Sequence, residues 1–122
     1  MILSEDHSNA TYQIKSVSPG KIVINNETYT NSVIISAEKL ISPWAPKNTN
    51  ELTDADLLQL LELKPEIILI GTGENSVILP AKKLKAVLEK QFHVECMNTK
   101  AACRTYTILI SEGRKVVAGL IL

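Results

Sequence analysis

The chain has 122 residues, of which 45% are hydrophobic, and its 13 basic and 13 acidic residues give a formal net charge of zero. This length and apolar content fit a single domain over residues 1–122 that buries its own core. The lack of a basic excess argues against nucleic-acid binding, because such proteins neutralise phosphates with Lys and Arg. The longest apolar run, residues 116–122, is far shorter than the roughly 20 residues that cross a bilayer.

The first ten residues are informative about the cellular compartment of the protein. They contain Glu5 and Asp6 but no Lys or Arg. A signal peptide begins with basic residues, and a mitochondrial presequence is rich in Arg and poor in acids. We therefore expect a cytoplasmic protein whose two cysteines, Cys96 and Cys103, are free thiols in a reducing environment.

The first half of the chain is predicted to consist mainly of strands. Pro19-Gly20 is a turn signal, and Asn25-Asn26 can supply the positive φ angles of a tight hairpin. The strands that these turns separate are expected at residues 12–17, 21–24, 27–30 and 32–36, as a small antiparallel meander.

The second half alternates helices with strands. Pro43 to Pro46 form a rigid loop around Trp44. A helix follows, with Thr53 as its N-cap and Asp54 and Asp56 in its first turn, where the helix dipole favours acids. It stops at Lys64-Pro65.

Three strands and two helices are expected beyond that stop. Residues 66–70 are apolar after the first and predict a strand that is buried on both faces. The pattern then predicts a helix at 81–91, a strand at 93–97, a helix capped by Asn98 or Thr99 that runs to about 112, and a strand at 115–122.

This order of elements defines the expected fold class. Strands that alternate with helices become parallel neighbours joined by right-handed crossovers. We predict a three-layer α/β domain with a central, largely parallel (mixed) sheet, covering helices and the N-terminal antiparallel meander.

Gly71, Thr72 and Gly73 follow the buried strand at 66–70. Ligands of open α/β sheets gather beyond the carboxyl ends of the strands, and glycines there expose N–H groups to an anion. The segment matches neither a dinucleotide fingerprint nor a Walker loop, because seven residues precede the next helix and no Gly-Lys-Ser/Thr follows. It is interpreted either as part of an anion site or as a tight turn.

A second candidate segment runs from Thr99 to Arg104. Cys103 lies about one turn into the predicted helix with Arg104 beside it, and both a helix N-terminus and a guanidinium favour the thiolate. Cys103 is thus the best nucleophile candidate, although a catalytic cysteine needs a base. Only His7 and His93 are available, and neither has a spacing that implies a catalytic dyad. The opposing interpretation is a buried structural cysteine.

Other side chains with chemical potential are also ambiguous. Arg104 either holds an anion with the glycine turn or forms an internal ion pair with a carboxylate such as Glu112 or Glu74. Trp44 either anchors a partner or plugs the end of the core. His93, Cys96 and Cys103 lack the number and spacing of ligands that structural zinc takes, so we expect no metal and no cofactor.

Three motifs resemble a known family. They are 68–73 (Ile-Leu-Ile-Gly-Thr-Gly), 97–106 (Met-Asn-Thr-x-Ala-Ala-Cys-Arg-Thr-Tyr) and 112–118 (Glu-Gly-Arg-x-Val-x-Ala), where x is any residue. They resemble a small, mostly uncharacterised family that includes the third assembly factor of mitochondrial NADH:ubiquinone oxidoreductase (complex I) and the adipogenesis-associated domain protein. Asn98 stands where the family typically has Asp, and Thr107 where it has Asn. Both changes preserve capping or polarity.

The resemblance implies a three-layer α/β fold and no established catalytic activity. We expect a non-enzymatic binding or assembly protein with a protein partner, present as a monomer or homodimer. The alternative is an enzyme or carrier for a small anion, with a pocket built from Gly71, Thr72 and Gly73 and from Thr99, Cys103 and Arg104. A third hypothesis is a module that binds its partner only through a surface formed by Trp44 and the lysines at 82, 83 and 85.

Overall fold

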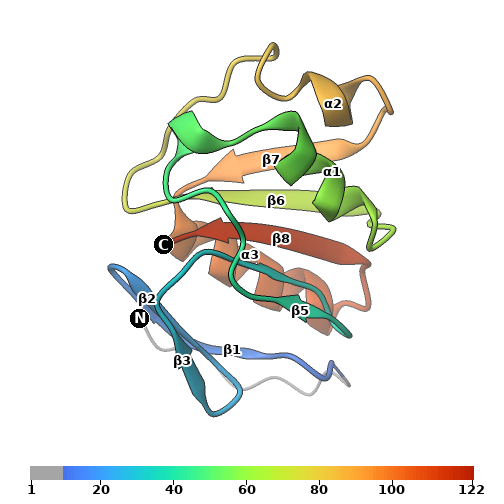
Figure 1. Cartoon of the computed structure of the whole chain (residues 1–122). Helices are drawn as coiled ribbons and strands as arrows, with labels where there is room; N and C mark the ends of the chain where they lie inside the picture. The colour runs from blue at the N-terminus through green and yellow to red at the C-terminus, as the bar shows by residue number, and fades with distance from the viewer. Residues whose placement is uncertain (1–9) are drawn as a thin grey trace.

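Two sheets and three helices make up the fold of this chain (Figure 1). The computed structural model describes residues 10–122. A three-stranded antiparallel sheet comes first and consists of β1 (Ile14–Ser18), β2 (Lys21–Ile24) and β3 (Glu27–Tyr29). The β2–β3 hairpin turns at Asn25, whose φ of 54° confirms the left-handed conformation that its sequence predicts.

The second sheet is the centre of the fold. It has five strands in the order β5-β4-β8-β6-β7. These are β4 (Val33–Ile35), β5 (Leu40–Ile41), β6 (Ile67–Thr72), β7 (His93–Met97) and β8 (Val116–Ile121). β6 lies between β7 and β8 and is parallel to both, whereas the pairs β4–β8 and β4–β5 are antiparallel. The predicted mixed sheet is confirmed.

The helices begin where their capping residues predict. α1 (Asp54–Leu61) starts at a capping box, in which the Thr53 hydroxyl accepts from Asp56 N–H and the Asp56 carboxylate accepts from Thr53 N–H. α3 (Thr99–Ser111) is capped by Asn98, whose side chain accepts from Ala101 N–H. α2 (Lys85–Leu88) and a short 3₁₀ turn (Thr49–Glu51) complete the set.

Each face of the five-stranded sheet carries its own hydrophobic core. One core joins the sheet to α3 and to the three-stranded sheet; Tyr106, Cys103 and Ile22 lie in it. The other joins the sheet to α1, α2 and the Trp44 loop. All six residues of β6 and of β8 are buried, as expected for strands covered on both faces. No helix within residues 10–122 has the length and apolar content that a membrane crossing requires.

Three elements differ from the sequence prediction. The strand expected at 32–36 does not extend the meander, because β4 leaves it to pair with β8. β5, of two residues, was not predicted. The helix expected at 81–91 shrinks to α2, because Leu84 provides no side-chain cap and hydrogen bonds to the third preceding residue take over on both sides.

Trp44 fills the second core and explains a glycine in the sheet. Trp44 is only 2% exposed, which confirms the prediction that it fills the end of the core. A Cβ atom on Gly119 of β8 would lie 2.6 Å from Trp44 Cη2 and 2.8 Å from Cζ3. The indole therefore sits directly on the backbone of β8, where only glycine leaves enough space.

Gly119→Ala is expected to lower the free energy of unfolding by about 1–3 kcal/mol, because a rigid, buried ring cannot move aside without strain. Urea denaturation monitored by circular dichroism measures this loss. In the double variant with Trp44→Leu, the alanine is expected to cost less than it does beside the native indole. Strict additivity of the two substitutions would contradict the contact.

Candidate functional site

The residues predicted to bind a ligand meet only in part. Gly71, Thr72 and Gly73 lie at the carboxyl end of β6, and Thr99 opens α3 beside them. β6 runs through Thr72, so the first two residues of the predicted turn are strand residues. The fold thus brings four of the six candidate residues to one place.

Thr99 is the centre of this place. Its hydroxyl donates to Ile121 O at the end of β8 and accepts from Gly73 N–H at 2.9 Å. Its own backbone N–H donates to Gly73 O at 2.8 Å. Thr99 is 5% exposed, so these bonds form away from solvent. One threonine therefore ties the ends of β6 and β8 to the start of α3, an arrangement called the Thr99 junction below.

Gly71 is required by the same junction. A Cβ atom on Gly71 would lie 2.8 Å from Thr99 Oγ1 and 3.0 Å from Thr99 Cα. The helix start thus occupies the space that any other side chain at position 71 would need. Packing accounts for this glycine without a ligand.

Thr72 is also satisfied from within. Its Oγ1 lies 2.7 Å from Asn75 O and 3.1 Å from Met97 O, both acceptors for its single proton, and it accepts from Val77 N–H at 3.2 Å. These bonds hold the loop after β6 against the end of β7. The single hydroxyl proton is therefore already engaged with protein acceptors and is not left to donate to a bound anion.

Cys103 lies apart from the strand ends, in the core between α3 and the sheet. Its side chain is 0% exposed, and desolvation raises the pKa of the Cys103 thiol to about 12. Desolvation is the largest cause of this shift in pKa, and it favours the neutral thiol over the thiolate. His93 lies on β7, exposed, with its Nε2 3.0 Å from Glu95 Oε2, and His7 lies outside the described residues. The Cys103 side chain makes no hydrogen bond within residues 10–122.

Arg104 is the sixth candidate site residue. It is exposed on the outer face of α3. The other arginine of the chain, Arg114, forms an ion pair from its Nε to Glu66 Oε1 at 2.6 Å. Periodicity of α3 placed Ala102 and Tyr106 on the buried face, and Arg104 lies two positions from each, on the opposite side of the helix.

A surface pocket does adjoin the Thr99 junction. It has a volume of about 230 Å³ and lies between the β1–β2 turn at Pro19, the segment from Gly73 to Glu74, and the start of α3 at Thr99 and Lys100. Sequence reasoning missed the contribution of the β1–β2 turn, because no local pattern shows that the two sheets approach one another there. Lys100 and Glu74 carry opposite charges, so the pocket has no charge excess.

Metal chemistry has little support in the described part of the chain. Residues 10–122 contain no group of three or more His, Cys, Asp or Glu side chains that could hold a metal ion. Cys96 and Cys103 are both free, as the sequence predicts.

The fold and junction define a class: a three-layer α/β domain with a mixed five-stranded sheet and a helix start locked to its strand ends. Residues 14–121 match the family described as "Protein of unknown function (DUF498/DUF598)", and the chain belongs to that family.

Relatives and solved structures agree with this assignment. A Francisella tularensis protein named "13 kDa major membrane protein" is 30% identical over 118 residues, which cover 95% of each chain. The NADH dehydrogenase (ubiquinone) 1 alpha subcomplex assembly factor 3 of Mus musculus is 27% identical over 98% of this chain, but the chain spans only 65% of that protein. A crystal structure of a Bordetella parapertussis protein superimposes with a TM-score of 0.84 at 31% identity and covers 92% of this chain and 96% of the other.

Thr99→Val is expected to lower the free energy of unfolding by about 1–3 kcal/mol, because Gly73 N–H and Ile121 O then lose their partner. Thr99→Ser keeps the hydroxyl and is expected to lose clearly less. Chemical denaturation of both variants beside the native chain makes the comparison. A valine variant as stable as the native protein would contradict the junction.

Cys103 is expected to resist iodoacetamide at pH 8 in the native protein, because its thiol is buried and protonated at that pH. In urea it is expected to react fully. Mass spectrometry of the peptides distinguishes it from half-buried Cys96, whose pKa burial raises to about 11. Rapid native labelling of Cys103 would show that the thiol is accessible and revive its candidacy as a nucleophile.

Proposed function

We propose that this chain is a non-enzymatic protein-binding domain of the assembly-factor type. The observation that carries the proposal is the internal satisfaction of the strand-end hydroxyls. The hydroxyls of Thr72 and Thr99 form hydrogen bonds with the protein itself. The carboxyl ends of the strands, where α/β domains usually hold small ligands, therefore contribute to packing in this chain.

The cysteine chemistry supports the same proposal. A nucleophilic cysteine needs a thiolate that substrate can reach, and usually a base within hydrogen-bond distance. Cys103 is sealed in the core with a raised pKa, and His93 is engaged with Glu95 on the molecular surface. The alternative, an enzyme or carrier for a small anion, would have to rely on the pocket beside Lys100, where Glu74 offsets the lysine charge.

The names of the relatives indicate which kind of binding protein to propose. Several are named as assembly factor 3 of NADH dehydrogenase, and this chain aligns over 98% of its length with the mouse protein. An assembly role requires contact with other proteins, and within residues 10–122 five large apolar side chains are exposed: Leu58, Val77, Ile78, Leu88 and Ile108. We propose a protein partner, and treat residues 1–122 as one domain. The cytoplasmic location stays a prediction that rests on the composition of the first ten residues.

Affinity purification of the tagged chain after mild crosslinking, from the organism that encodes it, tests the proposal. We expect a small set of proteins that belong to one multi-subunit complex, retained equally by the native chain and by Cys103→Ser. The serine variant is the matched control because it changes only one buried atom. A turnover activity of the folded chain that Cys103→Ser abolishes, without specific partners, would overturn the proposal.

A further inference from the structure

The last strand of the central sheet has an open edge. β7 ends the order β5-β4-β8-β6-β7, and its five residues pair in regular register with β6 alone. Within residues 10–122, no other segment is hydrogen bonded to the backbone of positions 93–96. The opposite edge strand, β5, has only two residues and offers far less to a partner.

Open edges are usually protected, and β7 lacks several of the usual devices, with one exposed acid, Glu95, on the strand itself. Proteins blunt such strands with proline, with a bulge or by keeping them very short. β7 contains no proline, and its register with β6 shows no shift. At about 3.3 Å per residue, β7 is roughly 17 Å long, and the backbone groups that point away from β6 are available to another strand.

Exposed apolar side chains stand at both ends of this edge. At one end, Val77 N–H donates to Thr72 Oγ1, which lies 3.1 Å from Met97 O, and the next residue, Ile78, is 94% exposed. At the other end, Phe92 N–H donates to Val87 O, which places α2 and the half-exposed Leu88 beside the start of β7. An added strand would cover these groups.

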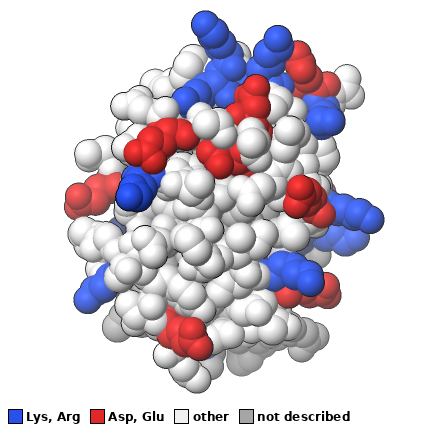
Figure 2. Space-filling model, viewed as in Figure 1, with Lys and Arg blue, Asp and Glu red and all other residues white. Residues whose placement is uncertain are grey.

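Lysines outnumber acids in the segment that precedes β7. At the top of the molecule in Figure 2, where Figure 1 places α2 and the connection before it, Lys and Arg side chains project outward beside several Asp and Glu side chains. The lysines of this segment are at 82, 83, 85 and 90, against one acid, Glu89. Glu89 Oε1 lies 3.7 Å from Lys85 Nζ, whereas Lys82 and Lys90 make no ion pair within residues 10–122.

We propose that the β7 edge binds an extended, acidic segment of a partner protein, which adds as a sixth strand beside β7. The inference rests on the proposed function and names the kind of partner that it requires. Backbone hydrogen bonds supply affinity, Val77, Ile78 and Leu88 contact the apolar side chains of the segment, and the lysines select for acids. A second copy of this chain fits less well, because a two-fold axis at β7 would bring equal sets of lysines together.

A fluorescein-labelled peptide of alternating glutamate and valine is the probe, and the same peptide with lysine for glutamate is its control. Fluorescence polarisation is expected to show saturable binding of the acidic peptide only. Amide hydrogen exchange is expected to slow at β7 on binding and to stay unchanged at β5. Equal binding of both peptides, no binding, or protection elsewhere would overturn the proposal.

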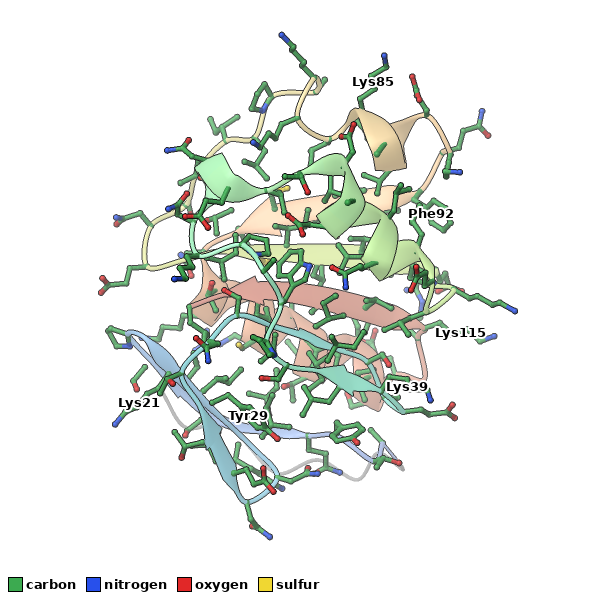
Figure 3. The ribbon with its side chains drawn as sticks, viewed as in Figure 1. Lys21, Tyr29, Lys39, Lys85, Phe92 and Lys115 are labelled. Carbon is green, nitrogen blue, oxygen red and sulfur yellow. The ribbon has the colours of Figure 1, made fainter. Side chains whose placement is uncertain are left out.

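Charge reversal supplies a matched pair of variants. Lys82→Glu/Lys85→Glu/Lys90→Glu is expected to weaken peptide binding at least about tenfold, since each exposed pair contributes modestly and three are reversed. Lys21→Glu/Lys39→Glu/Lys115→Glu changes the net charge equally at sites far from Lys85 (Figure 3) and is expected to change binding less than about twofold. Equal weakening by both variants would overturn the proposal.

Two further outcomes separate this inference from the proposed function. Protection of β7 that depends on protein concentration without peptide would assign the edge to a second copy and overturn the acidic segment. Full capture of the cellular partners by the variant reversed at 82, 85 and 90 would also overturn it, but would leave the proposed function intact. Only a native chain that captures no partner would remove both.

Discussion

The structure depends on one buried hydroxyl. Thr99 begins α3 and also holds the ends of β6 and β8, because its oxygen accepts from Gly73 N–H and donates to Ile121 O. A helix dipole and two parallel strand ends meet there, and α/β domains commonly place a ligand at such a point. Here a side chain of the protein satisfies the backbone groups, and Gly71 leaves the space that the helix start occupies. The backbone groups at this point are therefore used in packing between β6, β8 and α3.

Most of the fold could be predicted from the sequence because its signals are local. Thr53 and Asn98 cap their helices through hydrogen bonds that span three residues, and Asn25 turns its hairpin with its own backbone. The uniformly apolar run at 67–70 directly indicates a strand that is buried on both faces. The family resemblance rests on the segments around Gly71, Cys103 and Gly113, and the match over residues 14–121 confirms it.

What could not be predicted depends on contacts between distant segments. Nothing near Val33 shows that β4 pairs with β8 instead of the meander, since both pairings bury the same apolar residues. The residue types around Cys103 favour a thiolate, but the depth of the core decides its protonation, and depth is a property of the whole fold. The open edge of β7 was also invisible, because an edge is defined by the strand order.

The central claim is that the strand ends around Thr99 serve packing and bind no small anion. Titration of the isotopically labelled protein with inorganic phosphate, followed by the amide resonances of Gly73, Thr99 and Lys100, tests it most directly. The account predicts only small, linear displacements that match those of exposed residues elsewhere and that vanish at constant ionic strength. A saturable displacement confined to these three amides would contradict it.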